Sequence, residues 1–510
     1  MLTSRKLCAF LCVALCIFSS IISYGTEYGD AIRNQAAVVD SFHGKPRVLV
    51  LTDIGNEPDD QMSLTRFLLY SNEFDIEGLV ATTSTWQRNK VSPEIIEKVL
   101  SNYGRIQSNL LKHAEGFPTF EQLSALVKPG QPAYGMAAVG TDKLTPGAQL
   151  LIDAVDRKDT RPLYVSVWGG ANTLAQALWQ VRESRGPEEL RQFISKLRVY
   201  SISDQDDAGH WLRREFPELF YIVNPSTQDG EEYRSATWTG ISGDKYYRNA
   251  PGADFTTVSN KWLDEHVRSK GFLGETYPQY LFIMEGDTPA FFSLIENGLA
   301  SYRNPGWGGW GGRYVFRRPS GESRPIWTQG GDSFPGSPNS RDTVIGIDGQ
   351  GYTSDQATIW RWREAFQHDF AARMDWTMKE FNDANHNPVV VVNGDTTKEP
   401  IQVRAKVGTP VVLSALGTKD PDGNNVTYNW FYYPEATSAI SKPVSPDEVI
   451  GKRGEDQLDV PPKVAIEDSQ AEEARVLPKL PGAAHVLLVV EDDGVPSLTS
   501  YRRIVLDIEN

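Results

Sequence analysis

The chain has 510 residues, of which 66 are Asp or Glu and 51 are Lys or Arg, and its formal net charge is −15. This length exceeds the size at which a single hydrophobic core stops growing, so we expect two domains. The acidic excess argues against nucleic-acid polymers as partners, because their phosphates are bound by clusters of Lys and Arg.

The N-terminus has the layout of a secretory signal peptide. Arg5 and Lys6 precede the apolar run LCAFLCVALCIFSSII, and the small residues SYG follow it. The run is shorter than the roughly 20 residues that a membrane-spanning helix needs, so we expect cleavage of residues 1–25 rather than anchoring. All three cysteines lie in this segment. The sequence therefore predicts a secreted protein, periplasmic or extracellular, with no membrane segment after cleavage and no disulfide or thiolate metal site.

Between residues 46 and 300, apolar runs of strand length alternate with helical patterns. The predicted strands are 47–53, 76–84, 163–169, 197–203, 219–223 and 280–287. Segments such as EIIEKVLSNYGRIQSNLL and NTLAQALWQVRE separate them and carry apolar residues at helical spacing. Near-continuous apolar strands joined by helices predict an α/β fold, with a mostly parallel sheet covered by helices on both faces.

The period changes in the last third of the chain. Residues 301–345 are rich in Gly, Pro and Trp and read as a long loop, and a helical pattern returns at 355–381. Short alternating strands with Asp-Gly turns then follow, which is typical of a β-sandwich of the immunoglobulin or cadherin kind. We therefore expect an α/β domain at 45–385 and an accessory sandwich at 388–510, with a packing or carbohydrate-contact role.

An acidic turn follows the first predicted strand. Asp53, Glu57, Asp59 and Asp60 fall within TDIGNEPDD. One of these carboxylates could cap the following helix, but four of them favour a site for a hard cation such as Ca²⁺, which binds oxygen ligands. Because the ends of parallel strands meet at one edge of a sheet, Asp287 of MEGD is the best candidate for a further ligand.

Three motifs in this order resemble the nucleoside hydrolases of the inosine-uridine-preferring type. They are the acidic turn TDIGNEPDD, the Gly-rich turn GGANTLAQAL, which contains Asn172, and the segment MEGDTPA. With the Trp-rich region and the sandwich, the chain is similar to a secreted bacterial branch of that superfamily that is often labelled cellulose-binding. The resemblance spans residues 45–385 and, with the sandwich, nearly all of the mature chain.

The resemblance implies roles for five residues. Asp53 would be a calcium ligand and the base for the attacking water, and Asp59 would contact sugar hydroxyls. The remaining calcium ligands would be Asp60, Asp287 and the main-chain oxygen of Trp168. A cation held in this way would bind a sugar diol and orient water toward an anomeric carbon.

The chain departs from the family pattern at three places. Two residues are inserted between Asp53 and the aspartate pair, which makes Asn56 and Glu57 candidates to share the site. Gly286 stands where the family has a histidine that protonates purine leaving groups. The strand end VATTSTWQRN replaces a run that ends in a sugar-binding Asn.

Other residues are candidates to fill these gaps. The missing acid would be supplied by Glu285, by the segment 203–207 with Asp204, or by His210. Substrate-binding candidates at the altered strand end are Trp86, Gln87 and Asn89, and Trp307 and Trp310 are candidate stacking surfaces for sugar rings because glycines surround them.

The leading interpretation is a secreted Ca²⁺-dependent hydrolase of glycosyl bonds that acts on an N-ribosyl compound or a related sugar. One alternative is an O-glycosidase of cell-wall saccharides, which secretion, the extra tryptophans and the missing histidine favour. The other is a non-catalytic carbohydrate-binding protein, for instance of cellulose. The partners expected are thus a small sugar or nucleoside-like substrate, or a polysaccharide.

Overall fold

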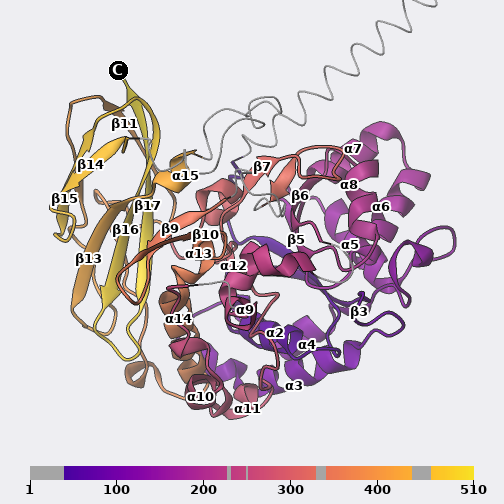
Figure 1. Ribbon diagram of the computed structural model, residues 1–510. Coiled ribbons are helices and arrows are strands. Elements are labelled where there is room, and N and C mark those ends of the chain that lie inside the picture. The colour runs from indigo at the N-terminus through magenta and orange to yellow at the C-terminus, as the bar shows by residue number, and fades with distance from the viewer. Residues whose placement is uncertain (1–38, 227–230, 248–250, 329–339, 439–460) are drawn as a thin grey trace, which may run out of the picture.

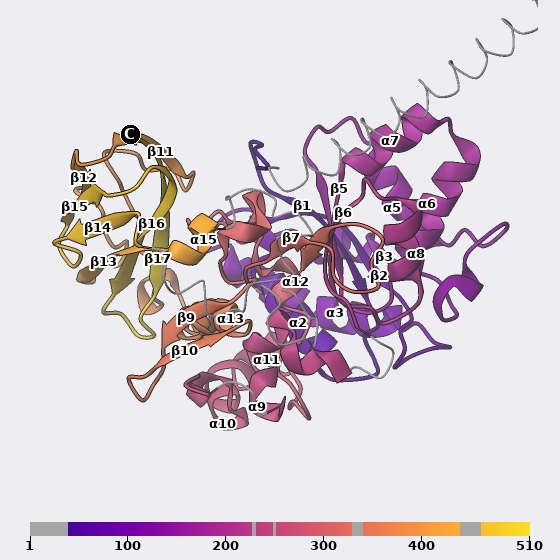
Figure 2. The same ribbon diagram turned by 45° about the horizontal axis from the view of Figure 1, so that its top comes forward.

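The computed structural model describes residues 39–226, 231–247, 251–328, 340–438 and 461–510. The predicted signal peptide and its cysteines lie outside these residues. Figure 1 shows an α/β part in indigo to orange and a yellow β-sandwich beside it, which Figure 2 shows as a separate lobe. In the described segments, no helix has both the length and the apolar character required to cross a bilayer.

The α/β part is built on an eight-stranded sheet of order β3-β2-β1-β4-β5-β6-β8-β7. Its strands are β1 (Arg47–Thr52), β2 (Asp75–Ala81), β3 (Val127–Pro129), β4 (Leu163–Val167), β5 (Leu197–Ser203), β6 (Phe220–Asn224), β7 (Val315–Arg317) and β8 (Ile326–Thr328). Every neighbouring pair is parallel except β7 with β8. The predicted mostly parallel sheet is confirmed.

Helices cover both faces of this sheet. Alternate residues of β1 point to opposite sides, so Val48 and Val50 belong to one apolar core and Leu49 and Leu51 to the other. The first core is closed by α2 (Asp59–Leu69), α3 (Pro93–Leu110), α12 (Pro289–Phe292) and α14 (Arg363–Trp376). The second is closed by α5 (Pro146–Asp156), α6 (Asn172–Ser184), α7 (Pro187–Ser195) and α8 (Ala208–Glu215).

Shorter elements lie outside these two layers. The short helices are α4 (Phe120–Ser124), α9 (Gly243–Tyr247), α10 (Asn260–Leu263), α11 (Gly271–Gly274) and α13 (Ala357–Trp360). An antiparallel hairpin of β9 (Asp342–Ile345) and β10 (Gly351–Ser354) points toward the sandwich in Figure 1. The long loop expected at 301–345 thus contributes two strands to the main sheet and one to this hairpin.

The predicted strand at 280–287 is wrong. These residues form no strand, and the place beside β6 is taken by β8. Leu281 and Phe282 are 71% and 50% exposed, so the apolar run that suggested a buried strand lies partly in solvent. An apolar run becomes a strand only where a neighbouring edge is free to pair with it.

The C-terminal part is a sandwich of two sheets, as predicted. One sheet has the order β11-β17-β16-β13, and the other has the order β12-β15-β14. Their bounds are β11 (Ile401–Lys406), β12 (Val411–Ser414), β13 (Val426–Tyr432), β14 (Val464–Glu467), β15 (Glu473–Pro478), β16 (Gly482–Asp492) and β17 (Thr499–Glu509). A short helix, α15 (Pro434–Ser438), follows β13. The two inner faces share one apolar core that includes Leu413, Trp430 and Leu488.

Directional hydrogen bonds join the sandwich to the α/β part. Arg503 of β17 is buried and donates from Nε to the main-chain oxygen of Leu299 (2.6 Å) and from Nη2 to that of Gly308 (2.9 Å). Tyr433 donates its hydroxyl to Asp342 Oδ2 at 2.5 Å. These contacts fix the loop after α12 against the sandwich.

Candidate functional site

The acidic turn lies where the strand order reverses. β1 and β4 are neighbours, and the chain continues from β1 to β2 on one side and from β4 to β5 on the other. Ligands of open α/β sheets bind beyond the carboxyl ends of the strands at such a point. Asp53 is the first residue after β1, and α2 begins at Asp59. The predicted site therefore occupies the position that this topology favours for a ligand.

Local geometry makes the turn compact. Gly55 has φ +110°, in the left-handed region, and a Cβ there would lie 2.8 Å from Ile95 Cδ1 of α3. Thr52 accepts a hydrogen bond from the Ile54 amide at 3.1 Å and donates its hydroxyl to Asp60 Oδ1. The first residues of the turn thereby orient the Asp60 carboxylate.

Three carboxylates converge at this point. Asp59, Asp60 and Asp287 each place an oxygen within 4.8 Å of the other two. Their side chains are only 8%, 5% and 3% exposed. Asp287 Oδ2 is buried and has no hydrogen-bond partner among the described residues. The structure thus brings Asp287 to the acidic turn although no strand carries it there.

Asp53 and Glu57 add negative charge to the same cluster. Burial, then the negative charges of Asp53 and Asp59, raise the pKa of Asp60. Burial, then Asp60, Asp59 and Asp53, raise the pKa of Asp287. Burial raises the pKa of Asp59 to about 7, with Glu57 and Asp53 contributing. Several buried carboxylates that raise one another's pKa need a proton or a cation between them.

The donor set fits a hard cation. Every side chain in the cluster offers carboxylate oxygens, and one of these, Asp287 Oδ2, is buried without a partner. Within the described segments, no ion pair joins a Lys or Arg to Asp53, Asp59, Asp60 or Asp287. Ca²⁺ takes six to eight oxygen ligands from such loops, so the residues present suit the ion that the sequence predicted.

The end of β4 borders this cluster through glycine. A Cβ on Gly169 would lie 2.5 Å from Asp53 Oδ1, so only glycine lets the two segments approach this closely. The Trp168 indole is buried in the core, and its main-chain oxygen accepts a hydrogen bond from Gln205 Nε2. The predicted role of this oxygen as a ligand would use its remaining lone pair.

The loop after β2 forms one wall beside Asp53. Burial raises the pKa of Asp53, and the nearby hydroxyl of Ser84 opposes this rise. Gln87 donates from Nε2 to the Asp53 main-chain oxygen at 3.0 Å. Trp86 is 43% exposed, and its indole lies close enough to Tyr233 to lower the pKa of that hydroxyl, which burial raises. An exposed indole keeps a face available for a ligand. Asn56 of the turn and Asn89 of this loop are exposed.

Tyr233 and Trp238 belong to the same wall and were not predicted as site residues. Their rings pack edge to face at 5.1 Å. A Cβ on Gly286 would lie 2.8 Å from Asp59 Oδ2 and 3.3 Å from the Trp238 ring. The space that a side chain at position 286 would need is therefore occupied. In the sequence, the only hint of this role was that Trp238 falls in or next to a predicted loop.

Glu285 does not take part in the site. It is fully buried, and Arg66 of α2 binds its carboxylate through Nε and through Nη2, the latter at 2.9 Å. Tyr277 donates its hydroxyl to the same carboxylate at 2.5 Å. The prediction that Glu285 contacts substrate is wrong, because these partners occupy its oxygens.

Asp204 and Asn172 also have structural partners instead of free polar groups. Both oxygens of Asp204 accept from Arg213, at 2.8 and 2.9 Å, beside His210. Asn172 is 0% exposed, and its amide bonds Thr82 and Thr83 with both ends. Their predicted roles as substrate ligands are corrected on this ground.

The two tryptophans of the Gly-rich loop are buried. Trp307 is 4% exposed and packs on His485 of the sandwich. Trp310 is 1% exposed and packs on Phe366 and Tyr501. The predicted stacking platform at these residues is wrong, because the sandwich covers the faces that the glycines leave open.

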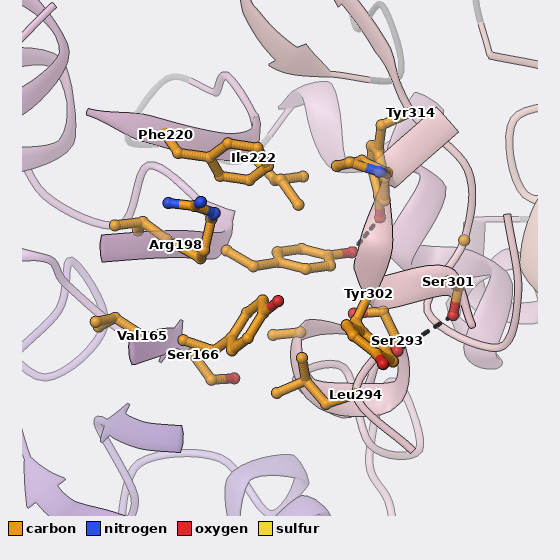
Figure 3. A pocket seen from close by; sticks show the side chains of 16 residues that line it. Val165, Ser166, Arg198, Phe220, Ile222, Ser293, Leu294, Ser301, Tyr302 and Tyr314 are labelled. Carbon is orange, nitrogen blue, oxygen red and sulfur yellow. Dashed lines mark hydrogen bonds between the residues drawn. The ribbon is translucent and has the colours of Figure 1, made fainter. Parts of the chain in front are cut away.

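A small cavity lies elsewhere, between the sheet and the segment after α12. It has a volume of about 30 Å³ and is lined by β4, β5 and β6 on one side and by residues 290–314 on the other (Figure 3). Tyr200 and Tyr314 join hydroxyls at its edge. This volume holds about one water molecule, so the cavity is too small for a sugar.

Comparisons with known proteins place the chain in a family. Residues 47–314 match the family described as cellulose-binding Sde182, nucleoside hydrolase-like domain, and residues 410–508 match the cellulose-binding protein Sde0182 C-terminal domain. A nucleoside hydrolase-related hypothetical protein from Saccharophagus degradans, associated with carbohydrate metabolism, is a similar solved structure. It has 35% identity and a TM-score of 0.73, over 91% of this chain and 100% of that chain.

Two effector proteins, XOO4466 and XopQ in complex with adenosine diphosphate ribose, match more weakly. Their identities are 12% and 13%, and both TM-scores are 0.29. They cover 59% and 60% of this chain, and 92% and 93% of their own chains. No significant match was found among curated proteins.

Proposed function

The chain belongs to the family of cellulose-binding Sde182 proteins with a nucleoside hydrolase-like domain, and from this premise we propose that it is a secreted, calcium-dependent hydrolase of glycosyl bonds. The convergence of Asp59, Asp60 and Asp287 beside Asp53 carries the proposal. Buried carboxylates without a counter-charge are unfavourable. A protein that only stacks sugar rings has no need of them.

The residues have distinct roles in this proposal. Asp53, Asp60 and Asp287 hold the ion, and the main-chain oxygen of Trp168 completes their set. When bound, calcium supplies positive charge that attracts the vicinal hydroxyl oxygens of a sugar and favours deprotonation of water. The cluster as a whole presents negative charge to the cationic sugar ring of the transition state.

Asp53 acts as the base that receives a proton from the attacking water. The nearby Ser84 hydroxyl favours the charged form of this carboxylate, and Gln87 fixes the main chain behind it. Asp59 accepts a hydrogen bond from a sugar hydroxyl, since its carboxylate lies between the turn and Gly286. Glu57 is half-buried at the rim and raises the charge density there.

The leaving group lies against Trp86 in this proposal. The exposed indole contributes its ring face to the contact with the leaving group. Gly286 provides no acid, and Glu285 is held by Arg66. The substrate in this proposal is an N-ribosyl compound or a related sugar. An O-linked saccharide of the cell wall, which the missing histidine favours, is the alternative substrate for the same site.

The test is hydrolysis by purified protein with calcium, on a nucleoside panel and an oligosaccharide panel. Free base identifies an N-glycosyl hydrolase, and new reducing ends without free base identify an O-glycosidase. Asp53→Asn should abolish either activity while leaving the protein folded, because the amide keeps the size of the side chain. Absence of both products with the wild-type protein would refute catalysis.

A second candidate function is carbohydrate binding without catalysis. The exposed indole of Trp86 favours it, as does the description of the family as cellulose-binding. In that case Trp86→Ala would abolish retention on cellulose and Asp53→Asn would not. Loss of retention in Asp53→Asn protein would count against this candidate.

A further inference from the structure

Asp492, at the end of β16, has one satisfied and one unsatisfied oxygen. Its Oδ1 accepts hydrogen bonds from the amides of Gly494 and Leu498, both at 2.9 Å, and from Asn385 Nδ2 at 3.0 Å. Its Oδ2 is buried and has no partner among the described residues, although the side chain is only 4% exposed. A buried carboxylate oxygen left in this state requires an explanation.

Asp420, in the turn before β13, repeats this arrangement. Its Oδ1 accepts from the amides of Asp422 (2.8 Å) and Asn424 (3.1 Å), which shape the turn. Its Oδ2 is buried and, within the described part of the chain, unpartnered. The neighbouring Asp422 differs, because His386 binds both of its oxygens.

The two acidic turns share one hydrogen-bonded network. Burial, and to a smaller extent the negative charge of Asp420, raise the pKa of Asp492. Asn424 Nδ2 donates to Asn385 Oδ1 at 2.8 Å, and Asn385 Nδ2 in turn donates to Asp492. A chain of amides therefore ties the two acidic turns together.

Asn385 comes from the segment that leaves the α/β part. Its main-chain oxygen accepts from the Trp376 indole at 2.9 Å, and its side chain reaches both sandwich turns. A Cβ on Gly494 would lie 2.1 Å from its Nδ2, so the amide lies directly against the turn backbone. The unsatisfied oxygens thus lie at the junction of the two parts.

We propose that Asp420 and Asp492 bind a second hard divalent cation, calcium, at this junction. Their Oδ2 atoms are its anionic ligands, and Asn385 and Asn424, whose amides link the two turns, carry amide oxygens that can serve as neutral ligands. Calcium prefers such mixed oxygen sets, and sites in extracellular modules bind it at about 10⁻⁴–10⁻³ M. The ion couples the segment after α14 to the sandwich, independently of the proposed hydrolase activity.

Native mass spectrometry and calorimetric titration with calcium chloride test this proposal on the full mature chain. We expect two calcium ions per wild-type chain. Asp420→Asn should bind one, since an amide keeps the turn hydrogen bonds of Oδ1 but removes the anionic ligand. Asp492→Asn should also bind one and provides a second variant if the first fails to fold.

Asp493→Asn is the matched control and should still bind two ions. Asp493 is adjacent to Asp492, but Asn425 occupies both of its oxygens at 2.9 and 2.8 Å. Asp60→Asn, which removes a ligand of the first site, should retain one ion.

Two results would overturn the junction site: two ions on folded Asp420→Asn protein, or none on folded Asp60→Asn protein. The latter would mean that a shared proton neutralises Asp420 and Asp492. One ion on both wild-type and Asp60→Asn protein would refute only the first site and support this one.

Discussion

Calcium should stabilise the α/β part more strongly at pH 8 than at pH 5. Burial, together with Glu57 and Asp53, raises the pKa of Asp59 from 3.8 to about 7 in the cation-free fold. A raised pKa means that the folded state favours the protonated carboxyl. Its contribution to stability is complete below about pH 4 and is lost as the pH rises through 7. The shift corresponds to about 4 kcal/mol for Asp59 alone.

The cation replaces the lost protons at high pH. At pH 8, calcium at 100 times its Kd stabilises the fold by about 2.7 kcal/mol. The melting temperature of a domain this large moves by about 1–2 °C for each kcal/mol, so we expect an increase of about 3–5 °C. At pH 5, calcium must displace bound protons, and the increase should stay below about 1 °C.

Scanning fluorimetry with a chelator or with excess calcium measures this difference. The Asp420→Asn background removes the contribution of the proposed junction site. Asp60→Asn should abolish the response, while Asp153→Asn on α5, an exposed carboxylate far from the site, should leave it unchanged. Equal shifts at both pH values, or a full shift in Asp60→Asn, would refute the reasoning.

Three further predictions concern single side chains. Gly169→Ala should abolish calcium binding at the first site and destabilise the fold by about 1–3 kcal/mol, because its Cβ would meet Asp53 Oδ1 at 2.5 Å. Calorimetry measures the calcium affinity, and thermal melts measure the stability. An unchanged calcium affinity would contradict this geometry. Trp86→Ala should raise KM by about tenfold with little change in melting temperature, since the indole is largely a surface group; an unchanged KM would exclude it from the substrate site. Glu285→Ala should destabilise by about 3–5 kcal/mol, because Arg66 would be left buried and unpaired; a melting temperature equal to that of the wild type would refute this.

The resemblance in the sequence pointed to the acidic turn as a candidate metal site, and the topology explains the position of this turn. TDIGNEPDD begins at the last residue of β1. The alternation of strands and helices in the sequence predicts a parallel sheet, in which the carboxyl end of β1 lies beside the ends of other strands. Local apolar patterns decide this much, because a strand that is buried on both faces must be apolar throughout. Asp59 and Asp60 begin α2 as the helical pattern after the turn predicted.

Asp287 reached the same site by a route that the pattern did not predict. Its segment is irregular, and β8, which is far along the chain, pairs with β6 instead. Strand formation depends on which edge remains unpaired, and that is a property of the whole sheet. Sequence periodicity carries no information on it.

The sequence by itself determined the family, the doubly covered parallel sheet, the sandwich and the acidic turn, because apolar periodicity, turn residues and motif order are local properties of the chain. Only the tertiary structure decided which polar and aromatic side chains are free. Trp307 is covered by the sandwich and Glu285 is paired with Arg66, whereas Trp86 remains exposed. Burial and pairing depend on residues far along the chain: the Glu285–Arg66 pair formed within the α/β part, and Trp307 was covered when the two parts packed together.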